Sequence, residues 1–264
     1  MLLMKRALLA LPLLLGSARL GSSSSSSSSS SRTNAEVAAI TKRWVDRVVI
    51  GKRLCPWARQ VYESDDKMRI SVLPQYSFQD WSSADARRSA RLTAEVLNEA
   101  KALAHPLLSG HTTLLILPNF APDSFEDYLS LSEGVDMALV EARLHRDIQL
   151  ATFHPLYRFA GSSKTDPANY TNRAPFPVLH LLRVDDVSAA IAQYGAARAG
   201  SGSGSGPGAG AGAGVGAGGG APTDEIFRSN VRTMTALGLP GVRRLLQSVF
   251  EEDEGASAVN AGEQ

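Results

Sequence analysis

The sequence predicts a single soluble α/β domain, with α+β as the alternative, in which helices cover a mixed sheet of about four to five strands. Stretches of apolar residues at helical spacing alternate with short apolar runs through the middle of the chain. The 264 residues are 44% hydrophobic, which is enough for one sizeable core once low-complexity stretches are set aside. This order of elements favours a sheet with helices packed on it.

The predicted helices are stretches in which apolar side chains recur on one face, bounded by capping residues, glycine or proline. The first is expected to end near Gly51, and His105-Pro106 ends the second. In the third, Asp123 is the expected N-cap and Glu126 completes a capping-box-like pair. The predicted helices cover residues 37–49, 81–103, 125–142, 185–194, 223–238 and 242–249.

Short apolar runs between these helices predict the strands. Thr112–Leu117 is a continuous apolar run stopped by Pro118, which is typical of a strand buried on both faces. The other strand candidates are Arg69–Leu73, Ile148–Phe153 and Val178–Leu182. No internal repeat, Walker A loop or dinucleotide fingerprint accompanies them.

Low-complexity stretches divide the chain. Residues 195–221 are almost wholly Gly, Ala and Ser and lack side chains that would bury a core, so we expect a flexible insert there. The α/β domain then comprises residues 33–194 together with C-terminal helices in 222–250. Residues 251–264 are an acidic tail that we expect to be frayed.

Residues 1–32 are predicted to be a targeting segment and a serine-rich linker without fixed structure. They contain Lys and Arg, no Asp or Glu, and the unbroken serine run Ser22–Ser31. An arginine-bearing, serine-rich and acid-free N-terminus is typical of a chloroplast or mitochondrial transit peptide. A secretory signal is the alternative, with Ala7–Leu15 as its apolar region and Gly16-Ser17-Ala18 as its cleavage site. That apolar run is too short to span a membrane.

Charge and cysteine content exclude several classes of protein. The formal net charge is +1, and no basic face is evident, so nucleic-acid binding is not expected. The single cysteine, Cys55, excludes an intramolecular disulfide and any zinc site with several cysteines. A chain without disulfides fits a reducing compartment. The oligomeric state is not defined by these features.

Polar candidate residues concentrate in His154–Arg183, where two predicted strands frame a long loop. Strand ends and the loops beside them commonly hold ligands in α/β proteins. The two histidines, His154 and His180, are candidate acid/base catalysts. Guanidinium groups bind carboxylate or phosphate through two parallel hydrogen bonds, which points to a small anion. The candidate ligand-binding residues are Arg158, Asn169, Asn172, Arg173 and Arg183.

We expect six of these side chains to converge on one concave pocket, with Cys55 near its edge: His154, Arg158, Asn172, Arg173, His180 and Arg183. The loop contains several prolines and asparagines, and a long but pinned loop in a compact domain is commonly functional. Each residue also has a structural interpretation: the histidines as satisfied core or strand-end residues, the arginines as clamps on loop carbonyls. Cys55 is a weaker candidate as a nucleophile, and otherwise a small buried hydrophobe.

Several segments of the chain resemble the DUF1415 family, which is classed only as a domain of unknown function. They are LCPWA (Leu54–Ala58), TTLLILP (Thr112–Pro118), IQLATFHPLYRFAG (Ile148–Gly161), NYTNRAPFPVLHLLR (Asn169–Arg183) and a closing helix with Asn230. The resemblance covers roughly residues 35–239, apart from the insert. The family usually has glutamate where this chain has Val184, so a carboxylate beside Arg183 is lost. No activity or cofactor follows from the resemblance.

Three functions fit these observations. The first is a binding protein or enzyme for a small anionic molecule, phosphate or carboxylate, with the histidine, arginine and asparagine site above. The second is a metal site made by Cys55, His154 and His180, residue types that bind zinc or iron, although their separations match no compact motif. The third is a structural or partner-binding domain in which the loop is only well pinned. Whether the protein is an enzyme stays open at this point.

Overall fold

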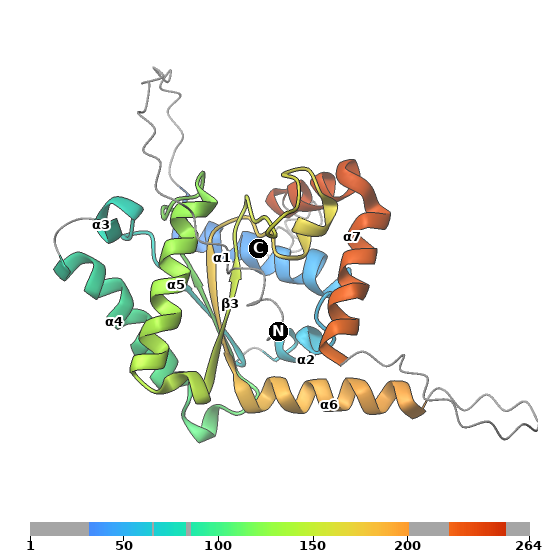
Figure 1. Ribbon diagram of the computed structural model, residues 1–264, viewed down its shortest axis with the longest axis horizontal. Helices are drawn as coiled ribbons and strands as arrows, with labels where there is room; N and C mark the ends of the chain where they lie inside the picture. Colours follow the sequence, from blue (N-terminus) through green and yellow to red (C-terminus); the bar gives the residue numbers. More distant parts are fainter. Residues whose placement is uncertain (1–31, 65, 83–85, 201–221, 252–264) are drawn as a thin grey trace, which may run out of the picture.

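The protein is described here by a computed structural model, which covers residues 32–64, 66–82, 86–200 and 222–251. Helices lie on both faces of one four-stranded mixed sheet, which confirms the predicted α/β class and the single domain (Figure 1). The predicted targeting segment, most of the predicted insert and nearly all of the acidic tail lie outside the described residues. None of the helices in the described part of the chain is long and apolar enough to cross a membrane.

The sheet has the order β1-β2-β4-β3. Strand β1 runs parallel to β2, whereas β4 is antiparallel to both β2 and β3. The strands are β1 (Met68–Val72), β2 (Thr112–Ile116), β3 (Ile148–Phe153) and β4 (Val178–Arg183), so each predicted strand is present with its ends within one residue. All five residues of β2 are buried, which confirms the interpretation of its continuous apolar run.

Two helical layers bury the two faces of this sheet, and alternate residues of each strand serve one layer or the other. Leu115 and Leu181 pack toward α4 (Ala86–Leu103) and α5 (Phe125–Glu141). Leu114 and Ile116 face the other layer. That layer consists of α1 (Asn34–Trp44), its π-helical continuation η2 (Val45–Ile50) and α7 (Pro222–Gln247).

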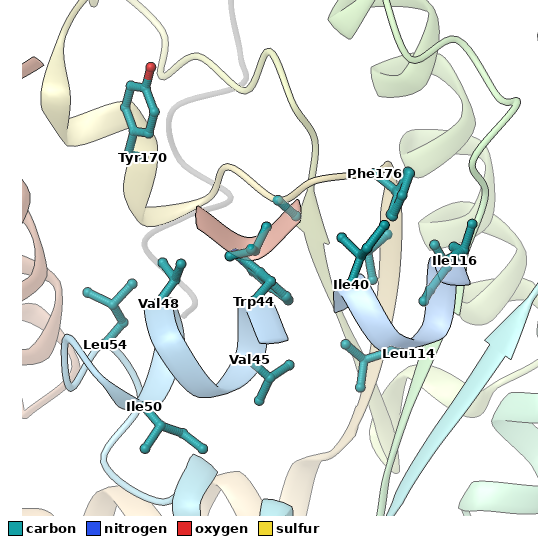
Figure 2. Packing of buried hydrophobic residues seen from close by; sticks show 14 of the residues in the cluster. Ile40, Trp44, Val45, Val48, Ile50, Leu54, Leu114, Ile116, Tyr170 and Phe176 are labelled. Atoms are coloured by element: carbon teal, nitrogen blue, oxygen red, sulfur yellow. The ribbon is translucent and has the colours of Figure 1, made fainter. Parts of the chain in front are cut away.

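The core of the second layer is densest at one end of the sheet. Trp44 and Ile40 of α1 pack beside Phe176, Leu114 and Ile116 (Figure 2). The Trp44 ring also meets that of Phe153 edge to face, with the ring centres 5.1 Å apart.

Some helix boundaries differ from the predictions. Ser124, not Asp123, is the N-cap of α5, because its hydroxyl accepts from the amide of Asp127 while its backbone is extended. Helix α6 (Val184–Gly200) runs past Tyr194 into the predicted insert, since alanine and arginine favour helix. Helix α7 includes both predicted C-terminal helices, separated by a break at Gly238, whose φ is 65°.

Short helices connect these main elements. Neither α2 (Ala58–Tyr62) nor η2 was predicted as a separate element. The remaining short helical elements are α3 (Phe78–Ser82), η3 (Pro106–Leu108), η4 (Leu144–Arg146), η5 (Pro167–Thr171) and η6 (Ser248–Phe250).

Candidate functional site

A cavity of about 760 Å³ lies between the sheet and the helical layer that contains η2 and α7, and residues of α6 also line it. We call it the interlayer cavity. Its sheet wall includes Thr112, Leu114, Ala151, His180 and Leu182. The facing walls include Val49, Leu54, Cys55 and Trp57, with Val187 and Ile191 of α6 and Ile226, Phe227 and Asn230 of α7.

The sheet wall of the cavity includes one small side chain, Ala151, beside His180. Ala151 stands opposite His180 in the β3–β4 ladder, and Leu114 stands opposite it in the β2–β4 ladder. An alanine in this position covers little of the imidazole beside it. Aromatic rings of Trp57, Phe159 and Phe227 also line the cavity, and the Phe153 ring lies 6.2 Å from that of His180. The cavity therefore adjoins the core and exposes one side of His180.

A hydrogen-bond chain fixes the His180 ring. The Thr112 hydroxyl lies 2.8 Å from the Leu181 carbonyl oxygen, to which it donates. The same hydroxyl oxygen lies 2.6 Å from Nε2 of His180. A threonine hydroxyl has one hydrogen, so it accepts at the second contact, and Nε2 of the imidazole donates to it. His180 is therefore held with its proton on Nε2.

Burial lowers the pKa of His180 to about 4, because the apolar surroundings disfavour the charged ring. Its partial exposure is to the interlayer cavity, which it lines. The ring is neutral at neutral pH, so it is a weak base but a ready hydrogen-bond acceptor. Its role as an acid/base catalyst stays a prediction.

Cys55 lines the same cavity, as expected for a residue at the edge of the site. Burial raises the pKa of the thiol to about 11, although the backbone amides of Trp57 and Ala58 oppose this shift. The sulfur is therefore a neutral thiol at neutral pH. Since the thiolate is the nucleophile, these surroundings suit a small apolar lining residue better than a reactive group.

Charged residues gather where the cavity meets the start of β1 and β2. Arg183 donates to the carbonyls of Leu103 (2.6 Å) and His105 (3.0 Å), and its Nε lies 3.2 Å from Asp186. The Asp186 carboxylate also accepts from the amide of Gly110 (2.7 Å). Arg183 is thus committed to the protein itself, although it lines the cavity.

Lys67 also lines the cavity at this end, and its ammonium lies near Gly110. No ion pair joins it to an acid in the described part of the chain. The Asp186 carboxylate, which accepts from the Gly110 amide, also lines this end of the cavity, so Lys67 lies beside both an acid and apolar walls. Sequence reasoning missed Lys67, because a lone lysine before a strand carries no motif.

His154 does not share this cavity. Its Nε2 lies 2.9 Å from the Ala121 carbonyl oxygen, and its Nδ1 accepts from the Leu156 amide at 3.0 Å. The ring is buried between Phe125 and Tyr128, and this burial lowers its pKa. Both nitrogens are used within the protein, so His154 ends β3 and holds a loop.

The alternation of side chains explains why the two histidines separate. Phe153 pairs with Val178, so Phe153, Val178 and His180 face the same layer. His154 follows Phe153 directly and therefore points to the opposite face, toward α5. The prediction that His154 and His180 share a pocket is wrong for this reason.

Three more of the predicted site residues hold the loop rather than line the cavity. The Arg173 guanidinium donates to the carbonyls of Tyr157 (3.1 Å) and Lys164 (2.9 Å), and it lies over the Tyr170 ring. The Asn169 side chain accepts from the Phe159 amide (3.0 Å) and the Ser162 hydroxyl (2.8 Å), and donates to the Ser163 carbonyl (2.8 Å). Arg158, 40% exposed, lies 3.6 Å from Glu126. The prediction that Arg158 and Arg173 join His180 in one pocket is wrong.

Two asparagines do reach the interlayer cavity. Asn172, a predicted site residue, accepts from the Thr171 hydroxyl (3.0 Å) and donates to the Thr152 carbonyl (3.3 Å). The side-chain amide of Asn230 in α7 donates to the Leu54 carbonyl at 2.7 Å. The side-chain carbonyl oxygen of Asn230 takes no part in this bond. Asn230 stood out in the sequence only through the family resemblance.

A metal site made by the predicted residues is not formed. Cys55 and His180 line the cavity, but His154 lies on the other face of the sheet. Within the described residues, no group of three or more His, Cys, Asp or Glu side chains is arranged to hold a metal ion.

The fold and the site define an α/β domain with helices on both faces of a mixed sheet and a cavity between one face and its helices. The chain belongs to the family described as "Protein of unknown function (DUF1415)", which matches residues 36–199, more than half of its length. The closing helix α7, with Asn230, lies beyond this match. No curated protein and no solved structure matches the chain.

Proposed function

We propose that the protein binds a small, mainly apolar organic molecule in the interlayer cavity. The observation that carries this proposal is the cavity itself, whose volume of about 760 Å³ lies within the usual range for small-molecule sites. Such sites combine apolar walls with a few polar groups that orient the ligand. Here most of the lining is aliphatic and aromatic, and His180, Cys55 and Asn230 supply polar atoms. The charged side chains in the lining are Lys67, Arg183, Asp186, Asp224 and Arg228.

We further propose that the ligand carries a carboxylate, bound near Lys67. A single ammonium without an acid partner in the described residues suits one carboxylate. A phosphate dianion generally needs several donors, and the arginines expected to supply them make other contacts. Arg183 binds backbone carbonyls and Asp186, and Arg173 clamps the loop. A carboxylate on an apolar body is therefore favoured over free phosphate.

Thermal unfolding of the full chain with decanoate, decanol and inorganic phosphate tests both parts of the proposal. Decanoate is expected to raise the melting temperature most, because a ligand that binds only the folded state stabilises it. Decanol is expected to raise it less, and phosphate not at all. If neither ten-carbon probe changes the melting temperature, binding of an apolar molecule is contradicted. If decanol equals decanoate, the carboxylate is contradicted.

Two variants locate the site. Ala151→Phe adds a ring beside His180 and is expected to abolish the shift with both ten-carbon probes. Lys67→Gln is expected to remove only the advantage of decanoate over decanol. Lys164→Gln is the matched control, because Lys164 is an exposed lysine on the loop and does not line the cavity. Circular dichroism of each variant checks that the fold is retained.

A further inference from the structure

The hydrogen bonds of His180 leave one of its ring nitrogens without a partner among the described residues. Thr112 uses its only hydrogen on the Leu181 carbonyl, so the Nε2–H group of His180 donates to the Thr112 oxygen. A neutral imidazole has one N–H, and Nδ1 is therefore a bare acceptor. No described residue donates to Nδ1.

The side chains around Nδ1 of His180 favour a ligand that donates a hydrogen bond to it. Nδ1 belongs to a ring that lines the interlayer cavity, whose nearest sheet neighbours are Ala151 and Leu114. None of these neighbours supplies a donor. A ligand group that donates to this acceptor gains a hydrogen bond that an apolar group in the same place cannot make. The Thr112 contact also fixes the ring, so little rotational freedom is lost when a ligand binds.

We infer that the cavity selects apolar ligands that carry a hydroxyl or N–H group, which donates a hydrogen bond to Nδ1 of His180. This inference rests on the proposed function and names the ligand class more narrowly: a hydroxylated or amino-substituted apolar acid rather than a plain one. A site built to receive a donor discriminates strongly against an analogue that lacks it.

Binding of decanoate and of its monohydroxylated positional isomers to the full chain tests the inference, with dissociation constants measured by calorimetry. One isomer is expected to bind at least about tenfold more tightly than decanoate, since placement of the hydroxyl decides whether it reaches Nδ1. In His180→Leu the advantage of that isomer is expected to disappear, while decanoate binds as well as before. Thr112 keeps its bond to Leu181 in this variant.

A spectroscopic measurement gives an answer that does not depend on a variant. Nitrogen NMR of histidine-labelled protein at pH 7 is expected to show a ring with the proton on Nε2 and an unprotonated Nδ1. The best hydroxylated isomer is expected to shift the Nδ1 resonance in the direction of hydrogen bonding, and decanoate is not.

The results of these measurements distinguish failure of the donor requirement at His180 from failure of the proposed function. If decanoate binds and no hydroxylated isomer binds more tightly, the donor requirement is overturned and the proposed function stands. An advantage that persists in His180→Leu also overturns it. If none of these acids binds, the proposed function fails and the inference fails with it.

Discussion

Burial lowers the pKa of His180 to about 4 and lowers that of His154 as well, both from an ordinary value of 6.5. The unfolded chain therefore binds protons at a higher pH than the folded protein does. This contribution to stability is fully present above pH 6.5 and is lost as the pH falls toward the folded pKa. For His180 the loss between pH 7 and pH 5 is expected to be about 2 kcal/mol.

Urea unfolding at pH 7 and pH 5 measures this loss. His180→Leu is expected to unfold with a smaller difference between the two pH values, because the titrating group is gone. His145→Gln, which replaces an exposed histidine, is expected to behave as the wild type. Equal pH dependence in the wild type and His180→Leu would show that His180 is not buried in its neutral form.

Arg173 is expected to affect stability rather than binding in the interlayer cavity. Its guanidinium joins the carbonyls of Tyr157 and Lys164, contacts that a lysine cannot make with the same fork. Arg173→Ala and Arg173→Lys are each expected to lower the free energy of unfolding by about 1–3 kcal/mol. Urea unfolding measures this change, and titration with decanoate should give an unchanged affinity.

Arg158→Ala is the matched control for the Arg173 variants, since Arg158 is a partly exposed arginine of the same loop region, 3.6 Å from Glu126. Its loss is expected to change the free energy of unfolding by less than about 0.5 kcal/mol. If Arg173→Ala binds decanoate more weakly and is as stable as the wild type, Arg173 contributes to ligand binding instead.

The sequence predicted the site residues only in part, and the reason lies in the pairing of the strands. The concentration of polar residues around the loop was visible, and His180, Asn172, Arg183 and Cys55 do line the cavity. Which face each histidine occupies depends on the register of β3 against β4. That register is a long-range property, and a shift of one residue exchanges the two faces.

Among the elements, the strands were predicted best. The continuous apolar run in β2 lacks the alternation of a half-exposed strand, so it predicted a fully buried one. Strand β3 matches its predicted range at both ends. Helix ends were less certain, because Asp123 and Ser124 are both good caps and their neighbours in space decide between them. The π-helical turn η2 has no short-range signal of this kind.

Gly51 closes η2, and its lack of a side chain is required there. A Cβ atom at this position would meet the carbonyl oxygen of Arg47 on the preceding turn. Gly51→Ala is therefore expected to lower the free energy of unfolding by more than about 1 kcal/mol, because the turn must open to admit the methyl group. Urea unfolding measures the change.

Lys52→Ala serves as the control for this variant, because it replaces the next residue and leaves Gly51 in place. It is expected to unfold nearly as the wild type does. If Gly51→Ala has the same stability as Lys52→Ala, the π-helical turn is not constrained by the close approach at Gly51.

At the scale of the whole molecule, the cavity is assembled by segments far apart in the sequence. Its lining extends from Trp44 to Asn230, and α6 and α7 meet across the segment 201–221, which lies outside the described residues. The sequence predicted the strands and the longer helices of this lining in type, but not α2 or the π-helical character of η2. It did not predict that the core would fill one end of a sheet face and leave the other open, because that depends on how the helices are placed.

Helix α7 belongs to the same core as the segment that matches the family, although it lies beyond that match. Met234 and Val242 of α7 and Val249 of η6 are fully buried against the α1 layer. The carbonyl oxygens of Ser248 and Val249 accept hydrogen bonds from Arg47 and Arg43. Burial of each of these apolar side chains contributes about 1.5–3 kcal/mol, so their sum approaches the net stability of a typical domain.

A chain that stops after Gly200 is therefore expected to lose its cooperative thermal transition, whereas the full chain unfolds in one step. A second variant tests the contribution of the segment that joins α6 to α7 while α7 itself is kept. Replacing residues 202–220 by a Gly-Ser linker of about ten residues is expected to change the melting temperature little, because loop length enters the closure entropy only logarithmically. Calorimetry of the three chains measures both effects. A truncated chain that melts cooperatively at the temperature of the full chain would show that residues 36–199 fold alone, with α7 as an accessory that closes the cavity.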